Sequence, residues 1–328
     1  MNMEKMNRKE IVFLYDAKLI NPNGDPLDDN KPRMLDDGTE IVTDVRLKRT
    51  IRDFIERNRE KDEFLKKRNA KVWLLDERTE EGEQKTKETQ LEERADYENY
   101  TDIKLFGATI LPKNEGKKES SKNVNVVLTG PVQFRFGISK NYVTPVFIKG
   151  TTVSPSGGGK KTGTFTERWV VDYALISFYG VVNENTAEQN AKEVPGEHKK
   201  VELKEEDLQV MYYAMWNGTK DLVSQSKVGQ TPRLLLVINY KKGNFQIGNV
   251  DLYLKLAKRE NIKSIEDCEL MLDDFLRVLK ENKEKIDSIY YKVDSALKLT
   301  KEGKPIEISK ALEEIGIGAK EFDKEYGF

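Results

Sequence analysis

The stretch that decides the fold is residues 11–26, Ile-Val-Phe-Leu-Tyr-Asp-Ala-Lys-Leu-Ile-Asn-Pro-Asn-Gly-Asp-Pro. Its first ten residues place apolar side chains on both faces of an extended chain, with Ile11, Phe13 and Tyr15 on one face. This pattern predicts a central strand that is covered on both sides. The Asn-Pro-Asn-Gly-Asp-Pro turn at 21–26 then ends the strand, because these residue types favour turns.

A helix is predicted to follow the turn. Thr43 is a suitable N-cap, and Asp44 suits the first helical turn. The apolar residues that follow have helical spacing and form a core face, namely Leu47, Ile51, Phe54 and Ile55. Three arginines spaced by three lie on a different face beside Lys48, namely Arg46, Arg49 and Arg52.

The rest of the chain supplies further elements. Strands are expected at 71–75, 124–139, 142–150, 164–182, 233–240 and 286–293, the last of these ending the sheet. Helices are expected at 102–107, at 204–216 and after Ser264. The helix after Ser264 would carry Cys268, Met271 and Phe275 inward. The acidic segment after residue 75 is expected to be partly helical. Without the insertions the order is strand, helix, strand, strand, helix, strand, which predicts an α+β, ferredoxin-like or RNA-recognition-motif-like fold. The long segments between these elements exceed ordinary loops, so we expect them to be functional.

Composition narrows the classes of function. The 328 residues predict about two domains, or one core with large insertions. A single cysteine, Cys268, excludes an intrachain disulfide and a Cys-rich zinc site, and a single histidine, His198, lies in a polar stretch expected to be a solvated loop. A Ser-His-Asp catalytic triad is therefore almost excluded. Without a signal-peptide pattern or a membrane-spanning stretch, the sequence predicts a soluble cytoplasmic protein.

Charge is segregated along the chain. The net charge is −1, from 56 Lys and Arg against 57 Asp and Glu. Residues 76–98 contain ten acidic and four basic residues (−6), whereas residues 113–168 contain ten basic and three acidic ones (+7). Three interpretations remain open: the basic segment binds phosphates, opposite patches join copies of the chain head to tail, or both are ordinary solvated faces.

The turn and the arginine row lie close in sequence and suggest a surface that follows phosphates, with asparagine amides, backbone N–H groups and guanidinium groups as donors. An ordinary turn beside a solvated helix face is the alternative. The aspartates of this region could instead hold Mg²⁺, although solvated turn aspartates are the commoner outcome. The Gly157–Lys161 stretch does not have the spacing of a Walker loop.

Several motifs, in this order, resemble the Cascade backbone subunit, the seventh CRISPR-associated protein family. They are 21–26, Pro32-Arg33, 42–49, 102–107, 129–133, 171–175, Tyr179-Gly180, Ser226-Lys227, Gly229-Gln230 and Pro232-Arg233. The 21–49 block is highly specific, the other motifs are individually weak, and together they span about residues 10 to 240. Within the family the chain looks like the type I-B branch, with type I-C close.

The resemblance implies a palm with a finger-like insertion and a thumb hairpin. Its boundaries would be 1–60 for the first half of the palm, 61–123 for the finger-like insertion with helices, 124–149 for a palm strand, 150–165 for the thumb tip, 166–249 for the second half of the palm, and 250–328 for a C-terminal helix and strand that complete it. Residues 112–123 are expected to be flexible. The basic segment 113–168 would follow nucleic acid, and the acidic segment 76–98 falls in the finger.

The resemblance also implies a function and partners. Copies of the chain would form a filament along one CRISPR RNA and display it for pairing with target DNA. Other partners would be the Cascade subunits, namely the subunit that binds the guide 5′ handle, the large subunit and the small subunit; no membrane, metal or cofactor is expected. The residues implied in RNA binding are Asn21, Asn23, Arg33, Arg46, Lys48, Arg49, Arg52, Ser226, Lys227, Gln230, Lys160, Lys161 and Phe165.

Two other functions stay open at this point. Related type III subunits cleave target RNA with an acidic loop, and Asp25 or Asp28 could serve that role as part of a metal-dependent endoribonuclease. The match to the type I branch favours a non-catalytic subunit. The third interpretation is a protein scaffold that binds no RNA.

Overall fold

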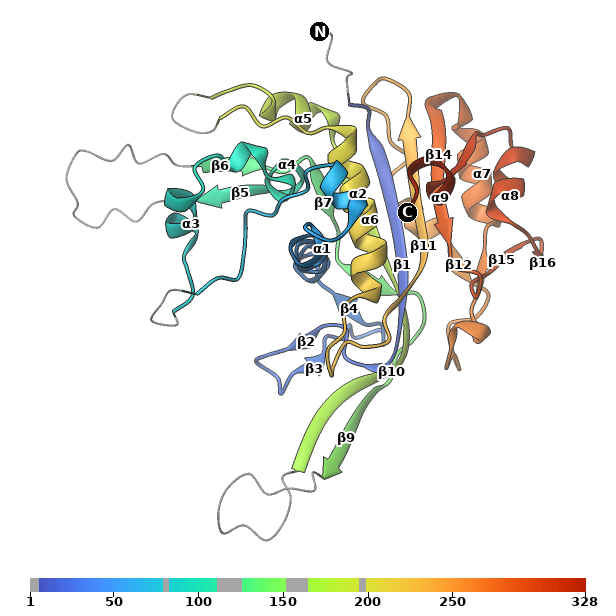
Figure 1. Ribbon diagram of the computed structural model, residues 1–328. Helices are drawn as coiled ribbons and strands as arrows, with labels where there is room; N and C mark the ends of the chain where they lie inside the picture. Colours follow the sequence, from blue (N-terminus) through green and yellow to red (C-terminus); the bar gives the residue numbers. More distant parts are fainter. Residues whose placement is uncertain (1–5, 79–82, 111–125, 152–164, 195–198) are drawn as a thin grey trace, which may run out of the picture.

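The computed structural model describes residues 6–78, 83–110, 126–151, 165–194 and 199–328. Strand β1 (Lys9–Ile20) runs through the middle of a nine-stranded sheet, as its two apolar faces predict (Figure 1). It pairs antiparallel with β10 (Phe165–Val182) on one side and with β11 (Thr231–Tyr240) on the other. Phe13 packs into the core on one face of β1, and Val12 and Leu14 pack into a second core on the other face.

The remaining strands extend this sheet on both sides in the order β17-β14-β11-β1-β10-β8-β4, with β7 and β9 also pairing along β10. Among the described strands of this sheet, β14 and β17 pair in parallel and the other pairs are antiparallel. The result is a mixed α/β molecule with a central sheet. The further strands are β4 (Ile41–Val42), β7 (Val132–Phe134), β8 (Gly137–Ser139), β9 (Pro145–Thr151), β14 (Ile286–Val293) and β17 (Ala319–Glu321).

Helices α1 (Asp44–Asn58) and α6 (Glu205–Lys220) cover one face of the sheet (Figure 1). α1 begins where expected, because the Thr43 hydroxyl accepts the backbone N–H of Arg46 at 3.3 Å. The two helices approach closely at Gly218 of α6, where an added Cβ would lie 2.9 Å from the Cβ of Phe54 on α1. This packing fixes the direction of α1 over the sheet.

A group of peripheral elements lies beside α1. It has its own apolar cluster, which contains Trp73, Tyr97, Ile103, Leu128 and Val201. This cluster holds the insertion against the helix-covered side of the sheet. Around this cluster lie α3 (Lys87–Glu93), the 3-10 helix Tyr97–Asn99, α4 (Thr101–Phe106), β5 (Gly107–Ile110), β6 (Val126–Thr129) and α5 (Glu184–Asn190). α2 (Glu63–Lys67) packs on the main core through Leu65. The hairpin of β2 (Gly24–Asp25) and β3 (Lys31–Pro32) lies away from the cluster, beside β10 (Figure 1).

The C-terminal part covers the opposite face of the sheet with α7 (Asp273–Glu281), α8 (Ile308–Glu314) and a small sheet of order β12-β13-β15-β16. Short helix α9 (Phe322–Tyr326) returns to the first face, where Phe322 joins the α1–α6 core. The small sheet consists of β12 (Lys255–Leu256), β13 (Glu269–Met271), β15 (Lys298–Lys301) and β16 (Lys304–Pro305), and 3-10 helices occupy Val250–Tyr253, Ile265–Asp267 and Lys283–Lys285.

The predicted central strand, first helix, helix 102–107 and helix 204–216 are confirmed. The single helix after Ser264 is wrong. Ser264 and Asp267 do form a capping box, but it heads a 3-10 helix, and Cys268, Leu270 and Leu272 are buried at every second residue. A period of two fits strand β13, so the helix begins only at Asp273.

Two other expectations about strands are also wrong. Residues 71–75 form no strand, because the carboxylate of Asp102 accepts the backbone N–H groups of Trp73 (2.7 Å) and Leu74 (3.2 Å) in place of a neighbouring strand. Strand 286–293 is not the last, since β15, β16 and β17 follow it. The predicted flexible stretch 112–123 and His198 lie outside the described residues.

Candidate nucleic-acid interface

The turn after β1 is fastened to a loop far away in sequence. The backbone N–H of Asn21 donates to the carbonyl of Ser226 at 3.1 Å. The ammonium of Lys227 donates to the carbonyls of Asn21 and Pro22, the latter at 2.8 Å. Residues 21–26 and 226–230, two of the motifs that carry the family resemblance, therefore lie side by side.

The turn is also fastened to the start of α1. The amide oxygen of Asn23 accepts both the backbone N–H and the hydroxyl of Thr43, each at 2.9 Å. The amide nitrogen of Asn21 donates to the carbonyl of Asn30 at 2.6 Å. Both asparagines thus shape the turn, and Thr43 transmits that shape to the first turn of α1.

A buried ionisable group lies beneath this junction. Glu40 is fully buried, and neither of its carboxylate oxygens has a hydrogen-bond partner among the described residues. Burial raises the pKa of Glu40 to about 8, although the charge of Lys227 opposes this shift. Burial, with a contribution from Arg46, lowers the pKa of Lys227 to about 8.

The four cationic side chains of α1 differ in their exposure and in the protein groups that they contact. Arg52 donates to the carboxylate of Asp102 at 2.9 Å and is 13% exposed, and Lys48 pairs with Asp44 at 2.8 Å. Arg46 donates to the hydroxyl of Thr50 at 3.2 Å. Arg49 bridges Asp53 (2.7 Å) and Asp76 (3.2 Å) but remains 46% exposed. The predicted arginine row is therefore one exposed guanidinium and three cations held largely by the protein.

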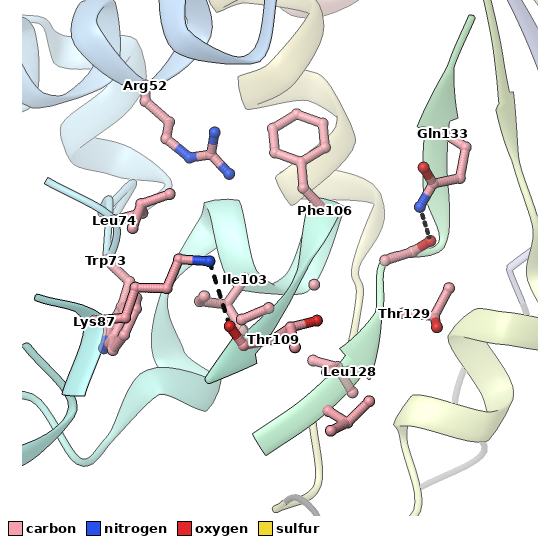
Figure 2. Close-up of a pocket in the computed structure, with 14 residues that line it drawn as sticks. Arg52, Trp73, Leu74, Lys87, Ile103, Phe106, Thr109, Leu128, Thr129 and Gln133 are labelled. Carbon is pink, nitrogen blue, oxygen red and sulfur yellow. Dashed lines mark hydrogen bonds between the residues drawn. The ribbon is translucent and has the colours of Figure 1, made fainter. Parts of the chain in front are cut away.

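A hollow of about 340 Å³ lies between α1, α4 and the β5–β6 hairpin. Figure 2 shows Arg52 and Phe106 at one side of it and Gln133 at the other. Its lining includes residues of two motif segments, 102–107 and 129–133, together with Arg52 of α1, which lies just after the 42–49 motif. The remaining motifs of the first half of the chain thus gather at a second place along α1.

Two glycines set the floor of this hollow. Gly107 ends α4 with a φ of 69°, and a Cβ there would lie 2.0 Å from the carbonyl oxygen of Leu128. A Cβ at Gly130 would lie 2.1 Å from the carbonyl carbon of Phe106. The two backbones cross so closely that neither position accommodates a side chain.

The base of the β9–β10 hairpin adjoins the junction. Arg168 donates to the carbonyl of Gln225 at 3.4 Å, and the ammonium of Lys31 lies 5.5 Å from the centre of the Trp169 ring. Arg33 pairs with Asp25 at 3.0 Å. These contacts place the hairpin beside both the turn and the 226–230 loop.

The other predicted residues are placed as follows. Gln230 is buried, at the start of β11. The backbone of Phe165 opens β10 opposite Thr151. Lys160 and Lys161, the predicted thumb contacts, lie outside the described residues.

Sequence reasoning missed several residues of this region. Glu40 gave no signal, because an isolated glutamate between turn residues looks solvated. Lys31 follows the turn directly, and Arg168 and Trp169 lie inside a predicted strand. Only tertiary contacts, Lys31 with Trp169 and Arg168 with Gln225, show that these residues lie together. Gln133 belongs to the 129–133 motif, but only the structure shows that its exposed side chain lines the hollow.

The arrangement suits the recognition of phosphodiesters, since it combines lysine and arginine donors with an exposed tryptophan-containing hairpin. Among the described residues, no group of three or more His, Cys, Asp or Glu side chains could hold a metal ion. No helix in the described part of the chain is long and apolar enough to cross a membrane.

Comparison with known proteins gives one family. The family model for CRISPR-associated protein Cas7 matches residues 7–273. CRISPR-associated protein Cas7 of Haloferax volcanii is 28% identical over 317 residues, which cover 90% of each chain. Two solved structures are also similar, each with a TM-score of 0.47. A chain of a CRISPR RNA-guided surveillance complex is 14% identical, and the match covers 90% of this chain and 95% of that one. A chain of a CRISPR RNA-guided surveillance complex described as pre-nicking is 13% identical, and the match covers 94% of this chain and 99% of that one. At that low similarity these structures add nothing to what the family match shows.

Proposed function

We propose that this chain, which belongs to the Cas7 family of CRISPR-associated proteins, holds its RNA at the junction of the 21–26 turn, the 226–230 loop and α1. The chain is a CRISPR RNA-binding backbone subunit of a Cascade-type complex. What remains to be assigned is the surface that binds the guide and the subtype of the complex.

One observation carries the assignment of the surface. Lys227 fixes the turn through the carbonyls of Asn21 and Pro22, so the two motif segments form one structure in spite of the 200 residues between them. Two exposed cations belong to the same region: Arg49 of α1, which also pairs with Asp53 and Asp76, and Arg168 of β10, which donates to the carbonyl of Gln225.

Unpartnered polar atoms at the junction support the same surface. Among the described residues, each of four predicted RNA contacts retains a buried polar atom with no partner, namely Asn21, Arg33, Arg46 and Gln230. Leaving such an atom unpaired costs about 1–3 kcal/mol. A ligand that reaches these atoms offsets this cost.

The finer architecture is part of the proposal. The strand order β11-β1-β10-β8, with α1 and α6 on one face, supports an RNA-recognition-motif-like palm. In this proposal the segment around α3 and α4 is the finger, and the β9–β10 hairpin leads to the thumb. Type I-B, a filament along the guide and a cytoplasmic location stay predictions.

The subunit is proposed to be non-catalytic. Asp25 pairs with Arg33 at 3.0 Å and Asp28 with Lys31 at 2.8 Å, so the carboxylates suggested for cleavage are held by cations of their own hairpin. We propose no second function.

The assignment is tested by replacing Lys227 with methionine, which keeps the apolar stem and removes the ammonium. Affinity for CRISPR RNA should fall about tenfold, because the turn loses the charge-assisted hydrogen bonds, worth roughly 1.5–3 kcal/mol, that hold Asn21 and Pro22 in place. Lys242→Met is the matched control, since it removes the same charge from an exposed position after β11. Equal losses in the two variants would contradict the proposed surface, because only a general charge effect would remain.

A further inference from the structure

A hollow with apolar walls lies on the face of the sheet that the C-terminal part covers. It measures about 390 Å³ and lies between β8, β10 and β12, a size typical of ligand-binding clefts. Ser177 of β10 lines it, and the alternate β10 residues Leu175 and Tyr179 belong to the second core on that face. The apolar walls consist of Ile138, Leu252, Leu254, Leu256 and Met271.

Two cations of this hollow form no ion pair. Four cations line it, and two of them are already neutralised, namely Arg135 by Asp251 at 2.6 Å and Lys255 by Asp274 at 2.7 Å. Neither Lys140 nor Arg259 has a carboxylate at ion-pair distance in the described part of the chain. The positive charge that is left for a ligand is therefore that of Lys140 and Arg259.

Neutral groups hold these two cations in place. The ammonium of Lys140 donates to the carbonyl of Asp251 at 2.5 Å, and Nε of Arg259 donates to the carbonyl of Lys140 at 3.1 Å. The guanidinium of Arg259 also lies 4.4 Å from the centre of the Tyr142 ring. Burial lowers the pKa of Lys140 to about 8, although the carboxylate of Asp251 opposes this shift. The guanidinium groups of Arg135 and Arg259 lower it further, so an anion in the hollow would relieve this repulsion.

Two buried polar atoms of the hollow set a second requirement. Ser177 and Asp251 are each 3% exposed, and the Ser177 hydroxyl and one carboxylate oxygen of Asp251 have no hydrogen-bond partner among the described residues. The hydroxyl can donate to an anion, whereas the carboxylate oxygen accepts. The occupant therefore needs an N–H donor as well as a negative charge. A peptide that carries a carboxylate supplies both, whereas the backbone of a nucleic acid supplies no N–H.

We propose that this hollow binds an acidic peptide segment of a partner protein, in which a carboxylate meets Lys140 and Arg259 and an aliphatic side chain lies against Met271. A main-chain N–H of the segment donates to Asp251, and one of its oxygens accepts from the Ser177 hydroxyl. The inference goes beyond the proposed function and does not depend on it, because no described residue of the lining belongs to the 21–26 turn, the 226–230 loop or α1.

Methyl NMR tests whether the peptide enters the hollow. The chain is labelled at its methionine methyl groups and titrated with the tripeptide Leu-Glu-Leu, acetylated and amidated at its ends. We expect the resonance of Met271 to move and those of Met211 and Met215, buried in the core on the opposite face, to stay. The matching peptide Leu-Gln-Leu should bind about tenfold more weakly, since it lacks two ion pairs. A Met271 resonance that stays in place up to about 10 mM peptide, or equal binding of the two peptides, overturns the inference.

A pair of neighbouring variants tests the role of the cations. Arg259→Gln should lower the affinity for the glutamate peptide about threefold and leave that for the glutamine peptide unchanged. Lys258→Gln is the matched control, because it removes a charge from the adjacent exposed residue outside the lining. Equal losses in the two variants would leave only a general charge effect and contradict the proposed contact.

Other occupants are tested with the same label. Inorganic phosphate and hexathymidylate are titrated at the concentrations used for the peptide, and we expect neither to move the Met271 resonance as far. A larger shift with either probe would mean that the hollow binds phosphate or nucleic acid, and the inference would be wrong. Failure of the chain to bind CRISPR RNA contradicts the proposed function alone, because the peptide titration contains no RNA.

Discussion

At the scale of single residues, the junction depends on Lys227 and on what lies beneath it. Its ammonium is held near the carbonyls of Asn21 and Pro22, and the buried carboxyl of Glu40 acts on it electrostatically. Glu40 itself has no hydrogen-bond partner among the described residues. A buried acid in this position links the stability of the junction to pH.

We therefore predict that Glu40→Gln flattens the pH dependence of stability. Because burial raises the pKa of Glu40 from 4.5 to about 8, the folded chain keeps this proton between those values while the unfolded chain loses it. Stability then falls as pH rises through this window, by up to about 1.4 kcal/mol per pH unit. Urea unfolding at pH 5 and pH 8 measures the difference; identical pH slopes for the variant and the wild type would show that Glu40 titrates normally.

The arginines of α1 should separate into structural and RNA-binding residues. Arg52→Ala leaves the carboxylate of Asp102, which is 1% exposed, without its cation and should cost about 3 kcal/mol of folding stability. Arg49→Ala should cost less than about 0.5 kcal/mol but lower the slope of RNA affinity against salt by about one. Chemical unfolding and a salt titration of RNA binding measure both effects. The assignment is wrong if Arg49→Ala unfolds the chain or Arg52→Ala leaves its stability unchanged.

At the scale of elements, the hollow beside α1 depends on the close approach between the end of α4 and the end of β6, including Gly130 just after it. Gly107 and Gly130 allow this approach, because an added Cβ at either would lie about 2 Å from the backbone of the other segment. Sequence reasoning placed Gly107 at the end of a helix but gave no reason for Gly130 beyond a turn.

Gly130→Ala should destabilise the chain by about 2 kcal/mol or more, since the neighbouring atoms are backbone and cannot move aside cheaply. Gly318→Ala is the control, because nothing lies within 4 Å of its added Cβ. Thermal unfolding of both variants measures the effect. Similar melting temperatures for the two would mean that the segments do not cross as described.

Some of these elements could be predicted from the sequence, and others could not. The apolar residues on both faces of β1 and the Thr43 cap of α1 are local signals, and both elements are confirmed. The region 264–281 was mispredicted because its apolar residues satisfy a period of two first and a helical period afterwards. Local patterns alone do not mark where that change occurs.

The site was predictable in its parts and not in its assembly. The motifs at 21–26 and 226–230 could be named, but the hydrogen bonds of Lys227 that join them depend on tertiary structure. The arginine row was predicted as a free phosphate-binding face because sequence spacing does not reveal partners such as Asp102. Glu40 could not be found at all, since its burial depends on three separate segments.

At the scale of the whole molecule, the near-zero net charge hides segments of opposite charge. Residues 76–98 have a balance of −6, and residues 113–168 have a balance of +7. Of the interpretations that the charge segregation left open, the proposed function uses phosphate binding, to which the basic segment contributes Arg168 beside the 226–230 loop.

A whole complex of this kind should leave bound RNA uncut. Target RNA complementary to the guide, incubated with the assembled complex and Mg²⁺, should remain intact, because Asp25 and Asp28 are paired within their own hairpin. Gel analysis over time measures this. Regular fragments that disappear in Asp25→Ala would establish the endoribonuclease alternative.

The most direct test of the central claim is photocrosslinking of the chain to CRISPR RNA, followed by mapping of the linked peptides. The account predicts crosslinks within residues 21–33 and 224–230 and at the base of the β9–β10 hairpin around Trp169. Crosslinks confined to the opposite face of the sheet, within residues 250–328, would contradict it.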